Sequence, residues 1–232
     1  MLLSVTLPVR NGARLLEAAG PVVWNWLQAH WPGESELVIA ENGSDDSTRE
    51  VAAELGRQYS AVRCLTLPCP GRGGALRKAW NSTPASIVGY MDVDLSTSLS
   101  DVPAMVKSIQ SGECDLVAAS RYLRPETTER SLRREVLSRG HNWLARRLTG
   151  LRVTDAQCGC KFLRREVRDM VLHQIRDDGW FFDTELLLAA QRSGFRIDEY
   201  PVHWTEAATS QVRTVPTVIG MLAGIWRVRA QG

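Results

Sequence analysis

Five short apolar runs alternate with polar or amphipathic stretches along the first half of the chain. Each run closes on a polar turn, which is typical of a buried strand; the runs cover residues 2–8, 36–40, 62–67, 86–91 and 115–119. Helices are predicted over about 11–30 (interrupted or kinked near Gly20-Pro21), 46–58 and 75–80. This alternation predicts an α/β fold, a doubly wound, mainly parallel sheet flanked by helices in one domain, 1–232.

The loops that follow the predicted strands carry most of the candidate chemistry. In a doubly wound sheet, ligands bind at the carboxyl ends of the strands. Four polar loops fall at that edge, at residues 8–12, 41–48, 68–74 and 92–98. We therefore expect a binding site formed by these loops together.

Composition narrows the class of protein. The chain has 232 residues, 44% hydrophobic and 23% charged, which predicts a core-forming globular protein. No apolar run approaches the roughly 18 residues of a membrane span, and the N-terminus has no signal-peptide pattern. Five unevenly spaced cysteines favour reduced thiols, so we expect a cytoplasmic location.

Charge is uneven along the chain. The net charge is only +2, which predicts no nucleic-acid partner, yet residues 121–168 hold 13 basic and 5 acidic residues. This segment therefore carries +8 and the remainder −6, a distribution that favours an anionic substrate or surface bound at one place. A solvated face of the helix predicted over 131–148 explains any single arginine equally well.

Two aspartates, Asp92 and Asp94, directly follow the fourth predicted strand. Side chains alternate along an extended segment, so residues two apart face the same way and their carboxylates converge. A hard divalent cation such as Mg²⁺ or Mn²⁺ relieves their repulsion and leaves coordination places for substrate phosphates. The alternative is a pair of loop aspartates that cap the next turn.

Two other loops allow a binding or a purely structural interpretation. In Glu41-Asn42-Gly43-Ser44-Asp45-Asp46, an acidic side chain could accept from a nucleobase N–H or a ribose hydroxyl, although a turn with a helix cap also fits. In Gly71-Arg72-Gly73-Gly74, backbone N–H groups and a guanidinium could meet phosphate oxygens, although a simple turn also fits. Neither loop is a Walker or dinucleotide-binding motif.

Some isolated residues could join this edge. His203 could reach the Asp pair as a further metal ligand, and Trp180 or Trp204 could line a sugar or acceptor pocket. No G-x-S-x-G elbow or H-E-x-x-H motif occurs, so a serine hydrolase or a zinc protease has no support.

Taken in order, the motifs resemble one enzyme family. They are LPVRNG, ENGSDDST, GRGGALR, MDVDLST, ASRY, TDAQCGCKFLRREV and WFFDTELLLAAQRSGFRIDEYPVHWTE. Their order and spacing resemble the inverting GT-A-fold family 2 glycosyltransferases, and the most similar branch is the dolichyl- and polyprenyl-phosphate glycosyltransferases. The resemblance runs through nearly the whole chain. It implies a nucleotide-sugar-binding half, 1–120, and an acceptor half, 121–232, which ends in an amphipathic segment.

The resemblance also implies residue roles. For the nucleotide sugar it implies contacts from Pro8, Arg10, Glu41, Gly43, Arg72, Gly73 and Asp92. For Mg²⁺ or Mn²⁺ it implies Asp94 with Asp92, beside the candidate His203. For catalysis it implies Asp94, Asp155, Glu185 and Arg121, and the acceptor is expected to meet Arg121, Arg133, Arg134 and Trp180.

Three departures from the family pattern bear on the substrates. Gly12 stands where many relatives have Glu, and Glu41 replaces an Asp of the second motif. Residues 209–211 read Thr-Ser-Gln in place of G-S-K, so a phosphate-facing Lys is missing unless Arg213 replaces it. The apolar segment 215–229 ends in basic residues and could lie in a membrane interface, or pack on the sheet as an ordinary helix.

The expected function is therefore metal-dependent, inverting sugar transfer from a nucleotide sugar, with a UDP-hexose or UDP-N-acetylhexosamine as donor. A polyprenyl- or dolichyl-phosphate acceptor is anionic near neutral pH and needs no base. A hydroxyl acceptor needs one, for which Asp155 and Glu185 are the candidates. Two alternatives stay open: a soluble small-molecule acceptor, or a non-catalytic nucleotide-sugar binding module. A lipid acceptor implies a peripheral membrane contact.

Overall fold

The computed structural model describes residues 1–129, 132–206 and 214–229. Within these ranges, only the backbone is described for residues 129, 132–134, 137, 141, 214–219, 221 and 222. In this part of the chain, no helix combines the length and apolar character that a membrane span requires.

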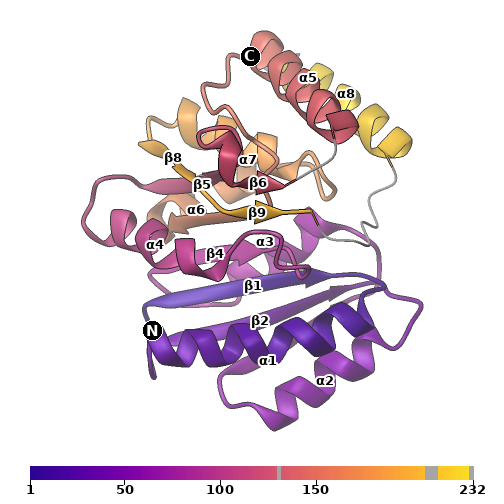
Figure 1. Ribbon diagram of the computed structural model, residues 1–232, viewed down its shortest axis with the longest axis vertical. Helices are drawn as coiled ribbons and strands as arrows, with labels where there is room; N and C mark the ends of the chain where they lie inside the picture. The colour runs from indigo at the N-terminus through magenta and orange to yellow at the C-terminus, as the bar shows by residue number, and fades with distance from the viewer. Residues whose placement is uncertain (130–131, 207–213, 230–232) are drawn as a thin grey trace.

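A seven-stranded sheet forms the centre of the molecule, in the order β3-β2-β1-β4-β7-β5-β8 (Figure 1). All neighbouring strands are parallel except β7, which is antiparallel to both β4 and β5. The strands are β1 (Leu3–Val9), β2 (Ser35–Asn42), β3 (Val62–Leu67), β4 (Ile87–Met91), β5 (Leu116–Ser120), β7 (Cys160–Arg164) and β8 (Ile197–Pro201). The short strands β6 (Thr128–Glu129) and β9 (Trp204–Thr205) pair separately.

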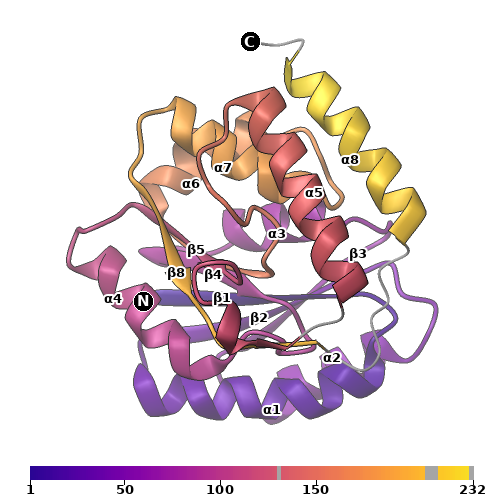
Figure 2. The same ribbon diagram turned by 45° about the horizontal axis from the view of Figure 1, so that its top comes forward.

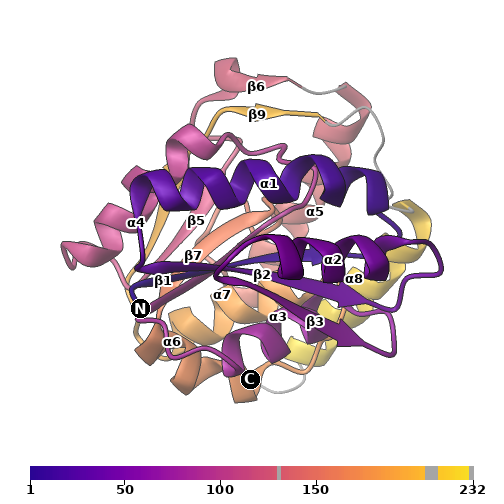
Figure 3. The same ribbon diagram turned by 90° about the horizontal axis from the view of Figure 1, so that it is seen from below.

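Helices cover both faces of the sheet, as Figure 3 shows for α1 on one side and for α3, α6 and α7 on the other. The helices are α1 (Ala13–His30), α2 (Thr48–Gln58), α3 (Arg72–Asn81), α4 (Val102–Gln110), α5 (Leu132–Thr149), α6 (Arg165–Val171), α7 (Phe182–Arg192) and α8 (Thr214–Arg229). One apolar core lies under α1, α2 and α4, and a second lies under α3 and α5–α8. The GT-A-type fold predicted from the sequence is confirmed.

The predicted elements lie close to the observed ones. All five predicted strands are present within about two residues, and α3 begins at Arg72 rather than 75. Helix α1 contains Pro21 and runs on to His30. Its neighbour Gly20 is packed so closely that a Cβ there would lie 2.6 Å from Leu55 Cδ1, which explains a glycine inside the helix.

Strand β7 ties the two halves of the chain into one sheet. It comes from the second half, yet it lies between β4 and β5 of the first half, with Met91 opposite Cys160. Because β7 is antiparallel, its beginning meets the carboxyl ends of β4 and β5. Residues 155–160 are therefore brought to the edge where the site was predicted.

Candidate active site

Asp92 lies at the end of β4, and its position is set by β7. Its backbone N–H donates to the Gly159 carbonyl at 2.9 Å. Its carboxylate packs over Gly159 so closely that a Cβ there would lie 1.7 Å from Oδ2. A side chain at position 159 would displace the carboxylate, so glycine is required there.

Asp94 lies two residues after Asp92, in the loop that follows β4. Leu95 adopts φ +50°, and the Ser96 N–H donates to Asp94 Oδ1 at 3.0 Å, which fixes the carboxylate in a tight turn. Burial raises the pKa of the Asp92 carboxyl, and the charge of Asp94 adds to that rise, whereas Arg72 opposes it. A carboxyl whose pKa is raised by burial and by a neighbouring carboxylate favours a bound cation.

A buried chain of charges lies beneath Asp92. Arg72 donates to Asp92 Oδ1 at 2.9 Å and to Asp183 Oδ2 at 2.7 Å. The Lys161 ammonium lies 3.3 Å from Asp183 Oδ1, and the Tyr90 hydroxyl donates to that same oxygen. Burial would raise the pKa of Asp183, but Lys161 and Arg72 outweigh it and lower that pKa. Two cations thus balance Asp92 and Asp183 and hold Asp92 in place.

Arg72 and Gly73 were expected to close over ribose and phosphates. The structure instead buries the Arg72 guanidinium between the rings of Tyr90 and Trp180, at 4.5 and 5.2 Å. The N–H groups of Gly73 and Gly74 donate to the Asp178 carbonyl, at 2.8 and 3.2 Å. The N–H groups of the glycine turn are therefore bonded to another loop of the chain, and Arg72 contacts the edge of the sheet through Asp92.

The expected nucleoside loops lie together beyond β1 and β2. Pro8 is buried in β1 opposite Ala40, and the Arg10 Nε donates to the Gly43 carbonyl at 3.1 Å. Gly43 has φ +70°, and a Cβ there would lie 2.9 Å from Cys69 C, so this crossing of two loops requires glycine.

Glu41 lies at the same crossing and is fully buried. Its Oε1 accepts from the Ser44 N–H at 2.6 Å. Within the described part of the chain its Oε2 has no hydrogen-bond donor, although Arg49 Nε lies 3.5 Å away. A buried carboxylate oxygen without a donor is costly in a folded protein, so this atom is suited to accept from a ligand N–H.

Arg121 and Asp155 form a buried pair at the end of β5. Arg121 donates from Nε and from a terminal nitrogen to the two Asp155 oxygens, both at 2.7 Å, and its backbone N–H donates at 3.0 Å. Asp155 is fully buried. Burial would raise its pKa, but the Arg121 charge and hydrogen bonds lower it. Asp155, expected among the catalytic residues, has both of its carboxylate oxygens bonded to Arg121.

Both carboxylate oxygens of Glu185 also have hydrogen-bond partners within the protein. Its Oε2 accepts from the backbone N–H groups of Arg176 and Asp177, at 2.7 and 2.8 Å. Its Oε1 accepts from Arg227 at 2.7 Å. One oxygen therefore binds the loop before α7 and the other binds α8, so neither is free of a partner within the protein.

His203 is not brought to the Asp pair in this arrangement. Its Nδ1 lies 3.2 Å from Asp101 Oδ1, and its backbone N–H donates to Asp101 Oδ2 at 2.8 Å. Among the described residues, no group of three His, Cys, Asp or Glu side chains could hold a metal ion. Asp92 and Asp94 would therefore hold a cation together with substrate oxygens, as Mg²⁺ is often held.

A cavity borders α5, in the half of the chain that was expected to bind the acceptor. The cavity has a volume of about 270 Å³ and is lined by Tyr122, Leu123, Arg139, Asn142, Trp143, Arg146 and Thr154. Arg139 lies 4.7 Å over the Tyr122 ring, and Asn142 donates to the Tyr122 hydroxyl at 3.2 Å. The side chains of Arg133 and Arg134 and all of residues 209–213 lie outside the described part of the chain. Trp180 does not line this cavity. It is 41% exposed, and its ring lies against the Arg72 guanidinium.

Sequence reasoning missed four residues that organise the site: Tyr90, Gly159, Lys161 and Asp183. Lys161 could have been noticed, because it is a charged residue in an apolar stretch that folds as a buried strand. The partners of Lys161 and Asp183 come from β4 and α3, so their roles follow only from the fold.

The fold and site define an α/β protein with paired carboxylates and buried arginines at the carboxyl edge of its sheet. The chain belongs to glycosyl transferase family 2, whose model matches residues 4–171. This membership confirms the expected enzyme class, a glycosyltransferase.

Named relatives of this chain include archaeal and eukaryotic proteins. It is 35% identical over 226 residues to glycosyltransferase AglD of Haloferax volcanii, covering 97% of this chain but only 36% of AglD. It is 30% identical to the dolichyl-phosphate beta-glucosyltransferase of Mus musculus, over 90% of this chain and 69% of that protein. The relative ALG5A of Trichomonas vaginalis, also named a dolichyl-phosphate beta-glucosyltransferase, is 28% identical over 98% of this chain and 76% of its own length.

A solved structure has the same fold. Glucosyl-3-phosphoglycerate synthase of Mycobacterium tuberculosis, in complex with Mn²⁺, UDP-glucose and phosphoglyceric acid, matches with a TM-score of 0.70 and 21% identity. The match covers 99% of this chain and 79% of that one.

Proposed function

We propose that this chain transfers a sugar, with inversion, from a nucleotide sugar to a polyprenyl-phosphate-type acceptor, using Mg²⁺ or Mn²⁺. One observation carries the choice of acceptor. The two carboxylates considered as a base, Asp155 and Glu185, are both engaged in buried ion pairs with arginines. An acceptor that needs no base, such as a phosphate, suits this arrangement better than a hydroxyl.

Asp94 and Asp92 would hold the cation. Their oxygens are hard ligands, and the bound ion would stabilise the charge that develops on the departing diphosphate. Arg72 supports this role, because it fixes Asp92 from below while Asp94 is fixed by its own turn. The solved relative complexed with Mn²⁺ and UDP-glucose is consistent with such a site.

Glu41 would recognise the base of the donor. Among the described residues no hydrogen-bond donor reaches its buried Oε2, and a uracil ring offers one N–H that this oxygen could accept. Arg10 and Gly43 lie at the same crossing of loops, and Pro8, in β1, lies two residues before Arg10. We therefore favour a UDP-hexose or a UDP-N-acetylhexosamine as donor.

Arg121 would meet the acceptor phosphate, and Arg139 and Arg146 line the cavity that Tyr122 borders. Asp155 holds Arg121 in a fixed orientation, so the guanidinium needs no rearrangement when the anion arrives. The names of two relatives, dolichyl-phosphate beta-glucosyltransferases, also favour a lipid phosphate. A bound phosphate oxygen would attack the anomeric carbon as the C–O bond to the diphosphate breaks, and no proton is transferred.

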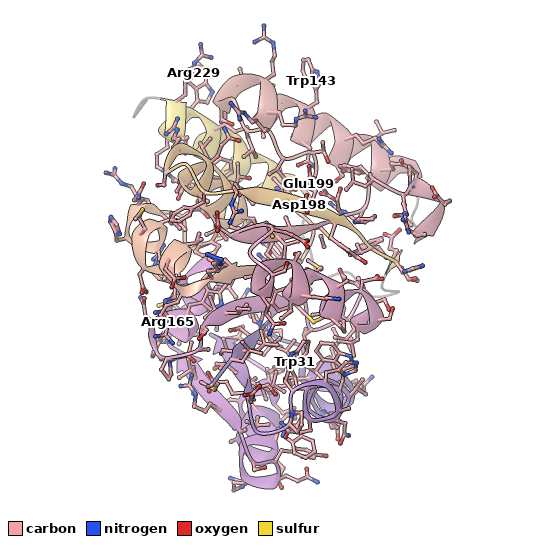
Figure 4. All side chains as sticks on the ribbon, turned by 90° about the vertical axis from the view of Figure 1, so that its left-hand side faces the viewer. Trp31, Trp143, Arg165, Asp198, Glu199 and Arg229 are labelled. Atoms are coloured by element: carbon pink, nitrogen blue, oxygen red, sulfur yellow. The ribbon has the colours of Figure 1, made fainter. Side chains whose placement is uncertain are left out.

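A lipid acceptor requires contact with a bilayer, and helices α5 and α8 offer a suitable surface. They lie side by side at one end of the molecule (Figure 2), where Trp143 and Arg229 project from the same end (Figure 4). Trp143 is 66% exposed and Trp226 is 68% exposed. Exposed tryptophans interspersed with arginines are typical of surfaces that lie in an anionic membrane interface.

Transfer assays with two kinds of acceptor test this proposal. Labelled UDP-glucose or UDP-N-acetylglucosamine would be incubated with Mn²⁺ and either a polyprenyl phosphate in detergent or glycerol 3-phosphate. We expect label to enter the organic phase with the lipid. Transfer only to the soluble phosphate would instead establish a small-molecule acceptor, and nucleotide binding without any transfer would indicate a binding module.

A further inference from the structure

The loop of residues 176–181 lies against the Asp pair through a short chain of contacts. It carries Trp180, whose ring lies 5.2 Å from the guanidinium carbon of Arg72. Arg72 donates to Asp92 at 2.9 Å. The Arg72 side chain therefore contacts both the 176–181 loop and Asp92.

On one side this loop packs on the start of α3. The Asp178 carbonyl accepts from the N–H groups of Gly73 and Gly74, and Arg77 donates to Asp178 Oδ1 at 2.6 Å. A Cβ at Gly73 would lie 2.7 Å from Phe182 Cβ. The same Cβ would lie 2.8 Å from the Asp177 carbonyl oxygen, so the backbones of the loop and of the start of α3 are packed closely together.

On its other side the loop is held by α8. Arg227 donates to Glu185 Oε1, at 3.0 Å from Nε and 2.7 Å from a terminal nitrogen, and to Asp177 Oδ2 at 2.9 Å. The other Asp177 oxygen accepts from the N–H groups of Gly179 and Phe181, at 2.8 and 3.2 Å. One guanidinium therefore joins two carboxylates that between them hold four backbone N–H groups of the loop.

Packing brings α8 to this position. A Cβ at Gly224 would lie 2.3 Å from Phe181 Cδ1, so the helix rests directly on a ring of the loop. Ile225 and Val228 are buried in the core on the same helix. Gly224 and Arg227 lie three residues apart and so share one face of the helix, which contacts the loop.

Arg227 balances the negative charges of two carboxylates that are largely buried. The side chains of Glu185 and Asp177 are only 7% and 18% exposed, and Arg227 is a cation that both share. Without it, two largely buried carboxylates lose a charged partner, which is strongly unfavourable, and the backbone between them becomes free to move toward water.

We propose that Arg227 is a positioning residue for sugar transfer: it holds the 176–181 loop, and thereby Trp180, Arg72 and Asp92, in the active arrangement. This role rests on the proposed function and adds to it, because it makes α8 a part of the site that touches no substrate. Helix α8, which carries the exposed Trp226, would then connect the surface of the molecule to the edge proposed to bind the metal.

Hydrogen exchange and kinetics of Arg227→Met, Arg227→Lys and a control test the proposal. Arg57→Met is the control, because it also breaks an arginine–carboxylate pair, but an exposed one on α2. For Arg227→Met we expect at least about tenfold faster exchange of the amides in 71–76 and 176–181. We also expect kcat to fall about tenfold while the KM for the nucleotide sugar changes less than threefold. Arg227→Lys keeps the charge but cannot bridge both carboxylates as a planar fork, so it should recover only part of the loss.

Exchange in 71–76 that stays at the wild-type rate in both Arg227 variants would overturn the proposal, even if α8 itself loosens or kcat falls. If Arg227→Met does not fold, the same criterion is applied to Arg227→Lys. Failure of the wild-type chain to transfer sugar to any acceptor would overturn the proposed function instead. The exchange data are independent of catalysis and would still decide whether Arg227 holds the loop.

Discussion

Replacement of Asp155 by Asn is the sharpest test of how Arg121 is held. Asp155 is fully buried, the Arg121 side chain is 8% exposed, and three hydrogen bonds join them. Loss of one partner of a buried pair costs about 3–5 kcal/mol, because the other charge is left buried. Asn keeps the shape and one acceptor, so we expect about 3 kcal/mol, the lower end of that range.

The expected loss of unfolding free energy is large enough to measure by thermal unfolding and by urea unfolding. For a chain of this size, 3 kcal/mol corresponds to a fall in melting temperature of roughly 6–12 °C. Urea unfolding of Asp155→Asn, Arg121→Met and the double variant would give the coupling energy directly, and we expect the double variant to lose less than the sum of the single ones. Transfer activity should fall in all three, because Arg121 is displaced or absent.

A different role for Asp155 would give a different pattern. If it acted as a base toward the acceptor, Asn would abolish transfer and leave stability nearly intact. A change in unfolding free energy below about 0.5 kcal/mol, or strictly additive effects in the double variant, would refute the buried pair as the support of Arg121.

Two further predictions follow from the same geometry. Asp155 and Asp183 have lowered pKa values in the folded chain, so their stabilisation should be complete above about pH 4, the unfolded value, and should be lost as pH falls through their folded values. Urea unfolding from pH 7 to 3 should show this decline, with a shallower slope in Asp155→Asn; an unchanged slope would contradict the assignment. Gly159→Ala should displace the Asp92 carboxylate and reduce Mn²⁺-dependent transfer at least about tenfold in a chain that remains folded by circular dichroism. Wild-type activity in this variant would show that Asp92 does not need its observed position.

The elements that depend on local pattern could be predicted from the sequence. The five strands and the Asp pair follow from apolar runs closed by polar turns, and both lie where expected. Strand β7 could not be placed in this way, because its antiparallel position between β4 and β5 depends on pairing between residues far apart in the chain.

The roles of individual carboxylates were harder to predict for the same reason. Asp155 meets an arginine 34 positions away, and Glu185 meets one 42 positions away, so nothing near either residue indicates its partner. Gly73 was expected at phosphates because glycine turns before helices often bind them; here the Asp178 carbonyl takes that place. Local motifs thus predicted the edge at which the site should lie, whereas the fold decides which side chains remain available to a ligand.

Calorimetric titration of UDP-glucose into the wild-type chain and into Asp94→Ala, each with Mn²⁺ and with EDTA, tests most directly whether the Asp pair holds a cation for the donor. We expect the wild-type chain to bind the nucleotide sugar at least about tenfold more tightly with Mn²⁺, and Asp94→Ala to lose that difference. Equal affinity with Mn²⁺ and EDTA in the wild-type chain, or an undiminished Mn²⁺ effect in Asp94→Ala, would contradict it.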